Sequence, residues 1–289
     1  MFAFVTLVML GDKYVAGALA LAKSLLSTNT RHRLVCMVTP DVSAAAVARL
    51  KMYYYVHIVE YVHYKCPRMM TKRQNQLYGS WIDYAFTKWQ CLRLTAFEKI
   101  VYLDADHLVV KNIDHLFDLN APAMCFYSEY HSYYDRLSHG DHVSSAQINT
   151  FLSRNKVLGK TGTMLLKPSP ILYSTVRKLL NGNNECLRQC RYDNGFDEQI
   201  LLQALVQNDI GVTQLSFVYV WNAGAYSKLR KNMEPFVINY YGDKKPWDVV
   251  EENPPYMDIY IWRYFKMLAD LDVKPPSSSP SLGNSRALR

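Results

Sequence analysis

The segment KIVYLDADHLVV, residues 99–110, joins an apolar run to two aspartates that stand one residue apart. The run at 100–103 is typical of a buried strand, and burying a carboxylate there is costly unless a partner neutralises it. In an extended segment, residues i and i+2 point to the same side, so we expect the carboxylates of Asp104 and Asp106 to lie together. The segment therefore predicts a strand that ends in a polar site.

Strands and helices alternate on the N-terminal side of this segment. Strands are expected at 2–10, 33–38 and 56–62, and helices at 14–26, 43–52 and 81–97. This order is typical of a mostly parallel sheet covered on both faces. Such sheets bind ligands beyond the carboxyl ends of their strands. The site is therefore expected at Asp104 and Asp106, with the segment from Thr6 to Tyr14 beside it.

The pattern is less regular on the C-terminal side. We expect a turn and short helix at 112–119, strands at 123–127 and 161–170, helices at 171–180 and 193–206, and a surface excursion over 127–145. The end of the chain is rich in Pro and Ser from Lys274 onward, and such a composition cannot offset the entropy of ordering. We predict one α/β domain, residues 1–270, and a disordered tail, residues 271–289.

The composition suits a globular protein that binds an anionic small molecule. Of the 289 residues, 49% are hydrophobic, 13% aromatic and 20% charged, which excludes a disordered chain. The net charge is +8 and the pI about 9.0, but Lys and Arg are scattered and form no long basic run. We therefore favour a phosphate-bearing small molecule over nucleic acid, for which the charge is the only argument.

The chain carries no clear signal for export or for a membrane. Its six cysteines are mostly far apart, which favours reduced thiols. The opening MFAFVTLVML lacks a positive start and a cleavage site, so we interpret it as a core strand and not a signal peptide. No apolar segment is long enough to span a membrane. A cytoplasmic protein is expected, and whether it forms a homodimer is left open.

Two carboxylates at the open edge of a sheet suit Mn²⁺, with Mg²⁺ as the alternative, because both ions keep positions for phosphate oxygens and water. A cation at a diphosphate absorbs the charge that develops as the diphosphate leaves. This chemistry favours a nucleotide-sugar transferase. The simpler interpretation is a pair of turn aspartates that cap the next segment, since Asp-x-Asp alone is a weak motif.

Four blocks of the sequence, in the same order, resemble the family 8 retaining glycosyltransferases, the group of glycogenin and galactinol synthase. They are AFVTLVMLGDKYVAGALALAKSLLST (3–28), FTKWQCLRLTAFEKIVYLDADHLVVKNIDHLFDL (86–119), GFDEQILLQ (195–203) and VINYYGDKKPW (237–247). The likeness covers roughly residues 3–250. It implies a single nucleotide-diphosphosugar transferase domain of GT-A type, with a Rossmann-like, mostly parallel mixed sheet.

The resemblance also implies a set of site residues. The residues implied to bind the donor and its metal ion are Thr6, Leu7, Tyr14, Asp104, Ala105, Asp106, Thr161, Gly162, Gly242 and Lys245, with Asp104, Asp106 and Asn239 as the metal ligands. The residues implied to face the donor sugar are Lys88, Asp197, Glu198 and Gln199. Without the resemblance, Lys88 would be interpreted as a solvated lysine, and the acids as ordinary helix-start residues.

Two positions depart from the family pattern. Asn239 stands where a histidine usually completes the metal site, and its amide oxygen is expected to be the weaker ligand. Lys160, Thr161 and Gly162 replace the usual Asn-Ser-Gly or Asn-Ala-Gly and place a cation beside the donor. These departures favour the alternative hypothesis, a non-catalytic UDP-sugar-binding homologue with a weakened metal site.

The resulting hypothesis is a retaining, Mn²⁺-dependent hexosyltransferase that uses UDP-glucose or UDP-galactose. Its acceptor is unknown: a polyol, a saccharide or a protein tyrosine. Tyr226 stands in a loop comparable to that of the tyrosine glucosylated in glycogenin, although coincidence is the simpler explanation in a chain with 22 tyrosines. Acceptor-binding residues are expected in the segments 62–80 and 127–158.

Overall fold

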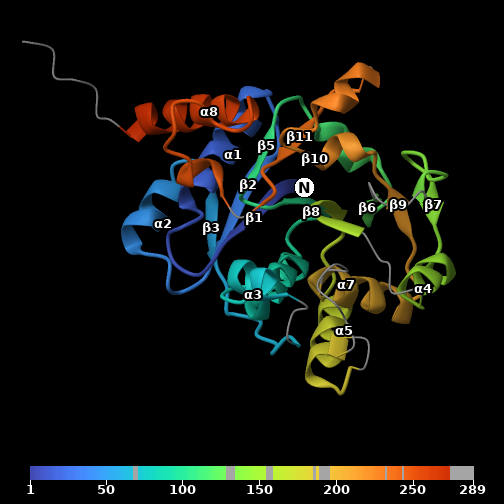
Figure 1. The fold of residues 1–289 in the computed structure, drawn as a ribbon. Helices are drawn as coiled ribbons and strands as arrows, with labels where there is room; N and C mark the ends of the chain where they lie inside the picture. The colour runs from blue at the N-terminus through green and yellow to red at the C-terminus, as the bar shows by residue number, and fades with distance from the viewer. Residues whose placement is uncertain are drawn as a thin grey trace, which may run out of the picture.

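The first strands of the chain form the parallel half of a large sheet. A computed structural model of the protein describes residues 1–67, 71–127, 134–153, 159–184, 187–188, 196–231, 233–242 and 244–273. Strands β1 (Phe2–Val8), β2 (Arg33–Val38), β3 (Tyr55–Ile58) and β4 (Lys99–Leu103) are parallel and lie in the order β3-β2-β1-β4. Strands β1, β2 and β4 are nearly continuous apolar runs because helices cover both faces of the sheet (Figure 1).

The other half of the large sheet is mixed. Strand β8 (Gly159–Leu166) runs antiparallel to β4, and β6 (Ala123–Phe126), β9 (Val212–Gln214) and β7 (His142–Val143) follow it across the sheet. The eight strands have the order β3-β2-β1-β4-β8-β6-β9-β7. The predicted α/β architecture with a mostly parallel mixed sheet is confirmed.

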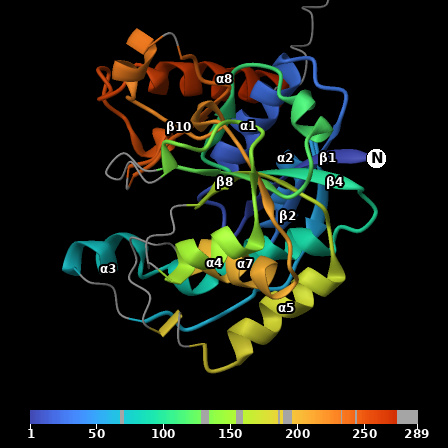
Figure 2. The ribbon, with the colours of Figure 1, turned by 90° about the vertical axis from the view of Figure 1, so that its right-hand side faces the viewer.

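Two groups of helices cover the sheet. In Figure 2, α1 (Val15–Ser27) and α8 (Asp258–Val273) lie on one side of it, and α4 (Ser145–Ser153), α5 (Pro170–Asn181) and α7 (Phe196–Gln207) lie on the other. The shorter helices are α2 (Ala44–Leu50) and α3 (Lys72–Tyr78) and the 3-10 helices η1 (Ile82–Arg93), η2 (Asp114–Asp118), η5 (Phe217–Tyr219), η6 (Tyr226–Lys231) and η7 (Pro246–Asp248). Across the described ranges, none of the helices combines the length and apolar character needed to cross a membrane.

A second, smaller sheet lies under α8. It contains β10 (Trp221–Asn222), β11 (Val237–Asn239) and β5 (His107–Val109) in the order β10-β11-β5. Its buried core consists of Ala20, Leu108, Ile238, Tyr240, Val249, Ile259 and Trp262. The sequence patterns did not predict this sheet.

The segment 81–97 differs from its prediction. It forms the 3-10 helix η1 and not a long α-helix, and the preceding strand ends at Ile58 and not at 62. The Thr87 hydroxyl accepts a hydrogen bond from the Val62 amide at 3.1 Å, and the Asp83 carboxylate accepts one from the Cys66 amide at 2.9 Å. Side chains of η1 thus bind the backbone at the end of the predicted strand and just beyond it, and these tertiary contacts override local propensity.

Several predicted ends also shift. Strand β1 stops at Val8 because Leu10 and Gly11 have φ values of 59° and 77°, outside the extended region. Helix α8 continues past residue 270, where the α/β domain was predicted to end. Its last turn is held by the Asp272 carboxylate, which accepts hydrogen bonds from Lys23 Nζ and Tyr53 Oη, each at 2.5 Å. The predicted tail from 274 and the predicted helix start at 193–195 lie outside the described residues.

Candidate active site

The two aspartates of the opening segment lie in a tight turn between the two sheets. The His107 amide donates to the Asp104 carbonyl at 3.0 Å, and the Asp104 amide donates to the Gly162 carbonyl at 2.9 Å. The turn carries the chain from β4 in the large sheet to β5 in the small one. The predicted extended backbone at Asp104 and Asp106 is therefore wrong, because the chain changes sheet at this point, but the predicted proximity of the two carboxylates is confirmed.

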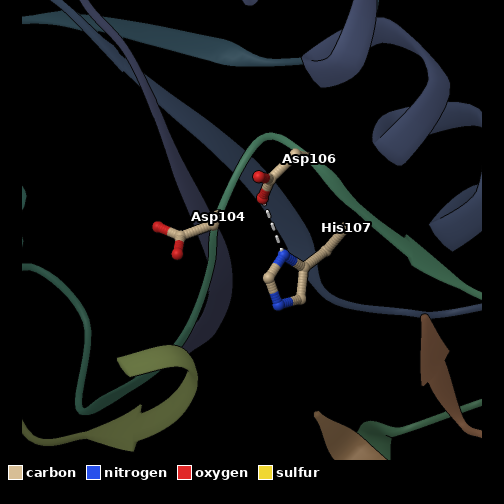
Figure 3. Close-up of side chains that lie close together, drawn as sticks. All are labelled: Asp104, Asp106 and His107. Atoms are coloured by element: carbon tan, nitrogen blue, oxygen red, sulfur yellow. Dashed lines mark hydrogen bonds and ion pairs between the residues drawn. The ribbon is translucent and has the colours of Figure 1, made fainter. Parts of the chain in front are cut away.

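The turn nevertheless gathers three side chains that fit a divalent cation. One ligand atom from each of Asp104, Asp106 and His107 lies within 4.8 Å of the others (Figure 3). The Asp106 Oδ1 and His107 Nδ1 atoms are 3.1 Å apart. The side chain of Asp104 is 33% exposed and that of His107 only 1%, so the group is open on one side. Two carboxylates and an imidazole are a donor set that Mn²⁺ accepts.

Lys245 pairs with the second aspartate. Its Nζ lies 2.6 Å from Asp106 Oδ2 and 3.0 Å from the Tyr240 carbonyl oxygen. Burial alone would raise the pKa of Asp106, but the Lys245 charge and a hydrogen bond from His107 outweigh it and hold that pKa well below its usual range. Burial raises the pKa of nearby Tyr14 to about 12.

Lys88 connects the first aspartate to helix α7. Its Nζ lies 2.9 Å from Asp197 Oδ2, 3.1 Å from Thr161 Oγ1 and 3.5 Å from Asp104 Oδ1. Burial acts to lower the pKa of Lys88, yet the charges of Asp104 and Asp197 raise it well above its usual value. The interpretation of Lys88 as a solvated lysine is therefore wrong, since the residue is only 9% exposed.

The two acids at the start of α7, Asp197 and Glu198, have pKa values that are shifted in opposite directions. Burial acts to raise the pKa of Asp197, but the Lys88 charge outweighs it and the pKa is lowered. For Glu198, burial and then the charge of Asp197 raise the pKa well above its usual value. The Glu198 Oε1 atom lies 3.0 Å from Thr161 Oγ1, and Gln199 is buried at the next position.

Two glycines permit the close packing of this site. A Cβ on Gly17 would lie 2.3 Å from the Ala105 carbonyl oxygen and 2.6 Å from the Trp247 ring, so α1 rests directly on the turn. A Cβ on Gly162 would lie 2.7 Å from the His107 ring and 3.3 Å from Asp104 Oδ2. Sequence reasoning missed Gly17, His107 and Trp247, and the only local signal among them is a histidine directly after the second aspartate.

The predicted uridine-binding residues lie at the same end of the large sheet as the turn. Val5 on β1 pairs with Tyr102 on β4, which places Thr6 and Leu7 near the carboxyl end of β4. Thr6 is buried, and its hydroxyl has no hydrogen-bond partner within the described part of the chain. The Tyr14 ring packs edge-on against Trp247, with ring centroids 5.1 Å apart.

The remaining predicted residues lie on or after β11 and at η6. Asn239 stands directly opposite His107 in the small sheet, and its Nδ2 donates to Asn222 Oδ1 at 3.2 Å. Gly242 has a φ of 115°, a conformation that glycine adopts at little cost. The Tyr226 hydroxyl accepts a hydrogen bond from the Asp258 amide at 3.3 Å.

Comparison with known proteins defines the class of the protein. The galactosyltransferase LgtC, solved with donor and acceptor sugar analogues, matches 92% of this chain and 95% of its own with a TM-score of 0.56 at 15% identity. The fold is therefore that of the GT-A glycosyltransferases. The family described as Glycosyl transferase family 8 matches residues 5–250. The chain belongs to glycosyl transferase family 8 and is a glycosyltransferase, as the sequence motifs predicted.

The relatives differ in how much of their length the chain spans. The uncharacterized protein R707 of Acanthamoeba polyphaga mimivirus is 28% identical over 95% of this chain and 99% of its own. The inositol phosphorylceramide glucuronosyltransferase 1 of Arabidopsis thaliana is 26% identical over 85% of this chain and 42% of its own. Human glycogenin-1 is 38% identical over 40% of this chain and 32% of its own. The chain thus spans less than half the length of the Arabidopsis glucuronosyltransferase and of human glycogenin-1.

Proposed function

We propose that the protein is a retaining, metal-dependent hexosyltransferase that moves glucose or galactose from a UDP-sugar to an acceptor. The observation that carries the proposal is the continuous polar network from the turn to α7. In it, Lys88 Nζ contacts Asp104 Oδ1 at 3.5 Å, Thr161 Oγ1 at 3.1 Å and Asp197 Oδ2 at 2.9 Å. The network joins groups that suit a diphosphate to groups that suit a sugar.

The charge balance of the site supports a bound cation. Three acids, Asp104, Asp106 and Asp197, pair with only two lysines, Lys88 and Lys245, so the carboxylates outnumber the ammonium groups even when Glu198 is left out of the count. Asp104 and Asp106 would hold Mn²⁺, or alternatively Mg²⁺. When bound, the ion would offset the negative charge that develops on the leaving diphosphate.

The side chains of the chain itself would orient the donor. The Lys245 ammonium, held beside Asp106, is a point charge suited to a phosphate oxygen. The raised pKa of Glu198 favours its neutral form, which can donate a hydrogen bond to a sugar hydroxyl, while the carboxylate of Asp197 can stabilise positive charge at the anomeric carbon. Thr6, Leu7 and Tyr14 would surround the uridine.

Lys160 supports a second candidate donor. It is exposed on β8, two positions before Gly162, whose backbone lies against His107 and Asp104. A lysine beside the donor would pair with the carboxylate of a hexuronic acid, and an Arabidopsis relative is named a glucuronosyltransferase. UDP-glucuronate therefore belongs in the donor panel.

The proposal is tested by titrating UDP, UDP-glucose, UDP-galactose and UDP-glucuronate calorimetrically, with and without Mn²⁺, and by measuring UDP release with polyol and saccharide acceptors. Mn²⁺ should strengthen UDP binding. In D104N/D106N this strengthening should vanish, and turnover should fall on the order of 100-fold or more because the charge stabilisation of the leaving group is lost. Asp118→Asn, at an exposed aspartate of η2, is the control.

Two outcomes would contradict the proposal. If D104N/D106N binds UDP as the wild type does and releases it at the same rate, the metal-dependent mechanism is wrong. If the wild type binds a UDP-sugar but never releases UDP, the alternative of a non-catalytic binding protein holds. Intact mass after incubation with each donor shows whether Tyr226 or another tyrosine is an acceptor, and an unchanged mass excludes self-glycosylation.

A further inference from the structure

The imidazole of His107 is buried without a complete set of hydrogen bonds. Its side chain is 1% exposed, Nδ1 lies 3.1 Å from Asp106 Oδ1, and Nε2 has no hydrogen-bond partner among the described residues. Burying an imidazole in this way costs free energy that a purely structural histidine normally avoids by bonding through both nitrogens. The ring is therefore a candidate to bind a group that the protein itself does not supply.

The lysines of the site leave the oxygen that faces His107 unobstructed. Lys245 contacts Asp106 through Oδ2, at 2.6 Å, whereas His107 contacts Oδ1 of the same carboxylate. Lys88 faces Asp104 through Oδ1, at 3.5 Å. The two ammonium groups thus occupy one oxygen of each aspartate, and Asp106 Oδ1 remains on the side of the imidazole.

The second oxygen of Asp104 also faces the imidazole. Asp104 Oδ2 lies 3.3 Å from the point where a Cβ on Gly162 would stand, and the Nε2 and Cε1 atoms of His107 lie 2.7 Å from the same point. Only a glycine at position 162 lets both groups approach this point. Lys160 and Thr161 depart from the family pattern, but Gly162 agrees with it, and this glycine leaves the space that the imidazole needs.

The separations suit one ion. In an octahedral site with bonds of about 2.1 Å, adjacent ligand atoms lie about 3 Å apart and opposite ones about 4.2 Å apart. The 3.1 Å between Asp106 Oδ1 and His107 Nδ1 fits an adjacent pair. The ligand atoms of Asp104, Asp106 and His107 all lie within 4.8 Å of one another, so a small adjustment would place them around one cation.

The register of the small sheet relates His107 to the position where the sequence lacks a histidine. Strands β5 and β11 are antiparallel, and His107 is paired directly with Asn239. Residues directly opposite each other present their side chains on the same face of a sheet, with Cβ atoms about 5 Å apart. The Asn239 amide meanwhile donates to Asn222. An imidazole at 107 can therefore serve the region that an imidazole at 239 would serve.

We propose that the imidazole of His107 is a ligand of the divalent cation, together with Asp104 and Asp106, and that it replaces the histidine absent from position 239. This inference rests on the proposed metal-dependent function and defines its ligand set. It differs from the sequence-based expectation, in which the amide of Asn239 was the third and weaker ligand.

The test is pulsed electron paramagnetic resonance of Mn²⁺ bound with UDP to protein labelled with ¹⁵N-histidine. The wild type should show hyperfine coupling of a histidine nitrogen to Mn²⁺. H107N keeps an amide group near Asp106 but removes the ring nitrogen. It should lose the coupling and bind Mn²⁺ at least about tenfold more weakly, measured from the signal of free Mn²⁺.

Two further variants make the result specific. H32N removes another histidine beside an aspartate, since His32 Nε2 lies 3.9 Å from Asp114 Oδ2, and it should leave the coupling and the Mn²⁺ affinity unchanged. H107N/N239H moves the imidazole to the opposite strand and should restore the coupling and most of the affinity. Circular dichroism and thermal unfolding establish that each variant is folded.

The outcomes separate this inference from the proposed function. A wild-type spectrum without histidine coupling overturns the inference. If H107N then binds Mn²⁺ with normal affinity, metal-dependent transfer stands without a role for His107. If H107N binds Mn²⁺ weakly, His107 only positions Asp106. If the wild type binds no Mn²⁺ in the presence of UDP, the inference and the proposed function both fail.

Discussion

Adjacent acids whose pKa values are shifted in opposite directions are the main feature of the site at the scale of single residues. Asp197 Oδ2 lies 2.9 Å from Lys88 Nζ, and this ion pair outweighs burial and lowers the pKa of Asp197. At Glu198, burial and the charge of Asp197 outweigh Lys88 and raise the pKa. The pKa values of the two neighbouring acids are thus shifted in opposite directions, so the two side chains can perform different tasks toward the same sugar.

The raised pKa of Glu198 predicts a dependence of stability on pH. The folded protein keeps a proton that the unfolded chain releases near its ordinary pKa of 4.5, so the stabilisation is present below that value and is lost as the pH rises toward the folded pKa. Glu198→Gln removes this titration and keeps a neutral side chain. The wild type should therefore lose stability relative to E198Q as the pH rises above 4.5, by at most about 1.4 kcal/mol per pH unit.

Urea unfolding across this pH range measures the difference. Glu60→Gln, at an exposed glutamate, is the control and should follow the wild type. Parallel pH profiles for the wild type and E198Q would show that Glu198 is ionised in the folded protein.

At the scale of elements, helix α1 positions the site. Gly17 lets the helix rest on the carbonyl of Ala105, and the Ser24 hydroxyl accepts a hydrogen bond from the Val109 amide on β5 at 3.0 Å. The helix therefore contacts both the turn that carries the aspartates and the small sheet that carries His107. Its packing is tight because the contact at Gly17 is with backbone atoms.

Gly17→Ala tests this contact. Alanine favours an isolated helix by about 1 kcal/mol over glycine, but the new Cβ would lie 2.3 Å from a backbone oxygen. Overpacking of this kind typically costs about 1–3 kcal/mol, so the variant should be less stable and should bind Mn²⁺ with UDP more weakly. Thermal unfolding and calorimetry check both effects.

Gly182→Ala is the matched control, because its new Cβ would meet only the Lys178 carbonyl at 3.2 Å. The variant should bind Mn²⁺ and UDP normally. If G17A is as stable and binds as well as the wild type, α1 does not hold the turn in place.

At the scale of the whole molecule, the site lies where two sheets meet. Strands β4 and β8 of the large sheet, with the start of α7, border the site on one side, and the small sheet under α8 contributes His107 and Asn239 (Figure 1). Trp262 of α8 is 4% exposed and belongs to the core of the small sheet. The docking of α8 should therefore support the metal site from a distance.

Trp262→Ala should cost about 3–5 kcal/mol, as large-to-small changes in a core do, and should weaken the binding of Mn²⁺ with UDP. Tyr264→Ala, on the exposed side of α8 at 53% exposure, should change neither measurement substantially. Urea unfolding and calorimetry on the folded proteins give the two values. A destabilised W262A that still binds normally would show that the site is independent of the docking of α8.

The sequence by itself determined the parallel half of the fold and most members of the site. The apolar strand at 100–103, the alternation of strands and helices before it, and the two aspartates after it are local patterns, set by backbone periodicity and by the cost of burying charge, whereas Lys88 and Asp197 were indicated only by the resemblance to a family. Each of these patterns can be recognised within a short segment of the sequence. The resemblance to a family then assigned roles to those residues.

Only the tertiary structure decided which side chains meet. The small sheet pairs His107 with Asn239, and the network joins Lys88 to Asp197, over separations of more than a hundred residues. No local periodicity encodes such pairings, because their free energy depends on the burial and register reached when the whole chain has folded. For the same reason the turn at Asp104, the close approach at Gly17 and the position of the His107 ring were visible only in the folded protein.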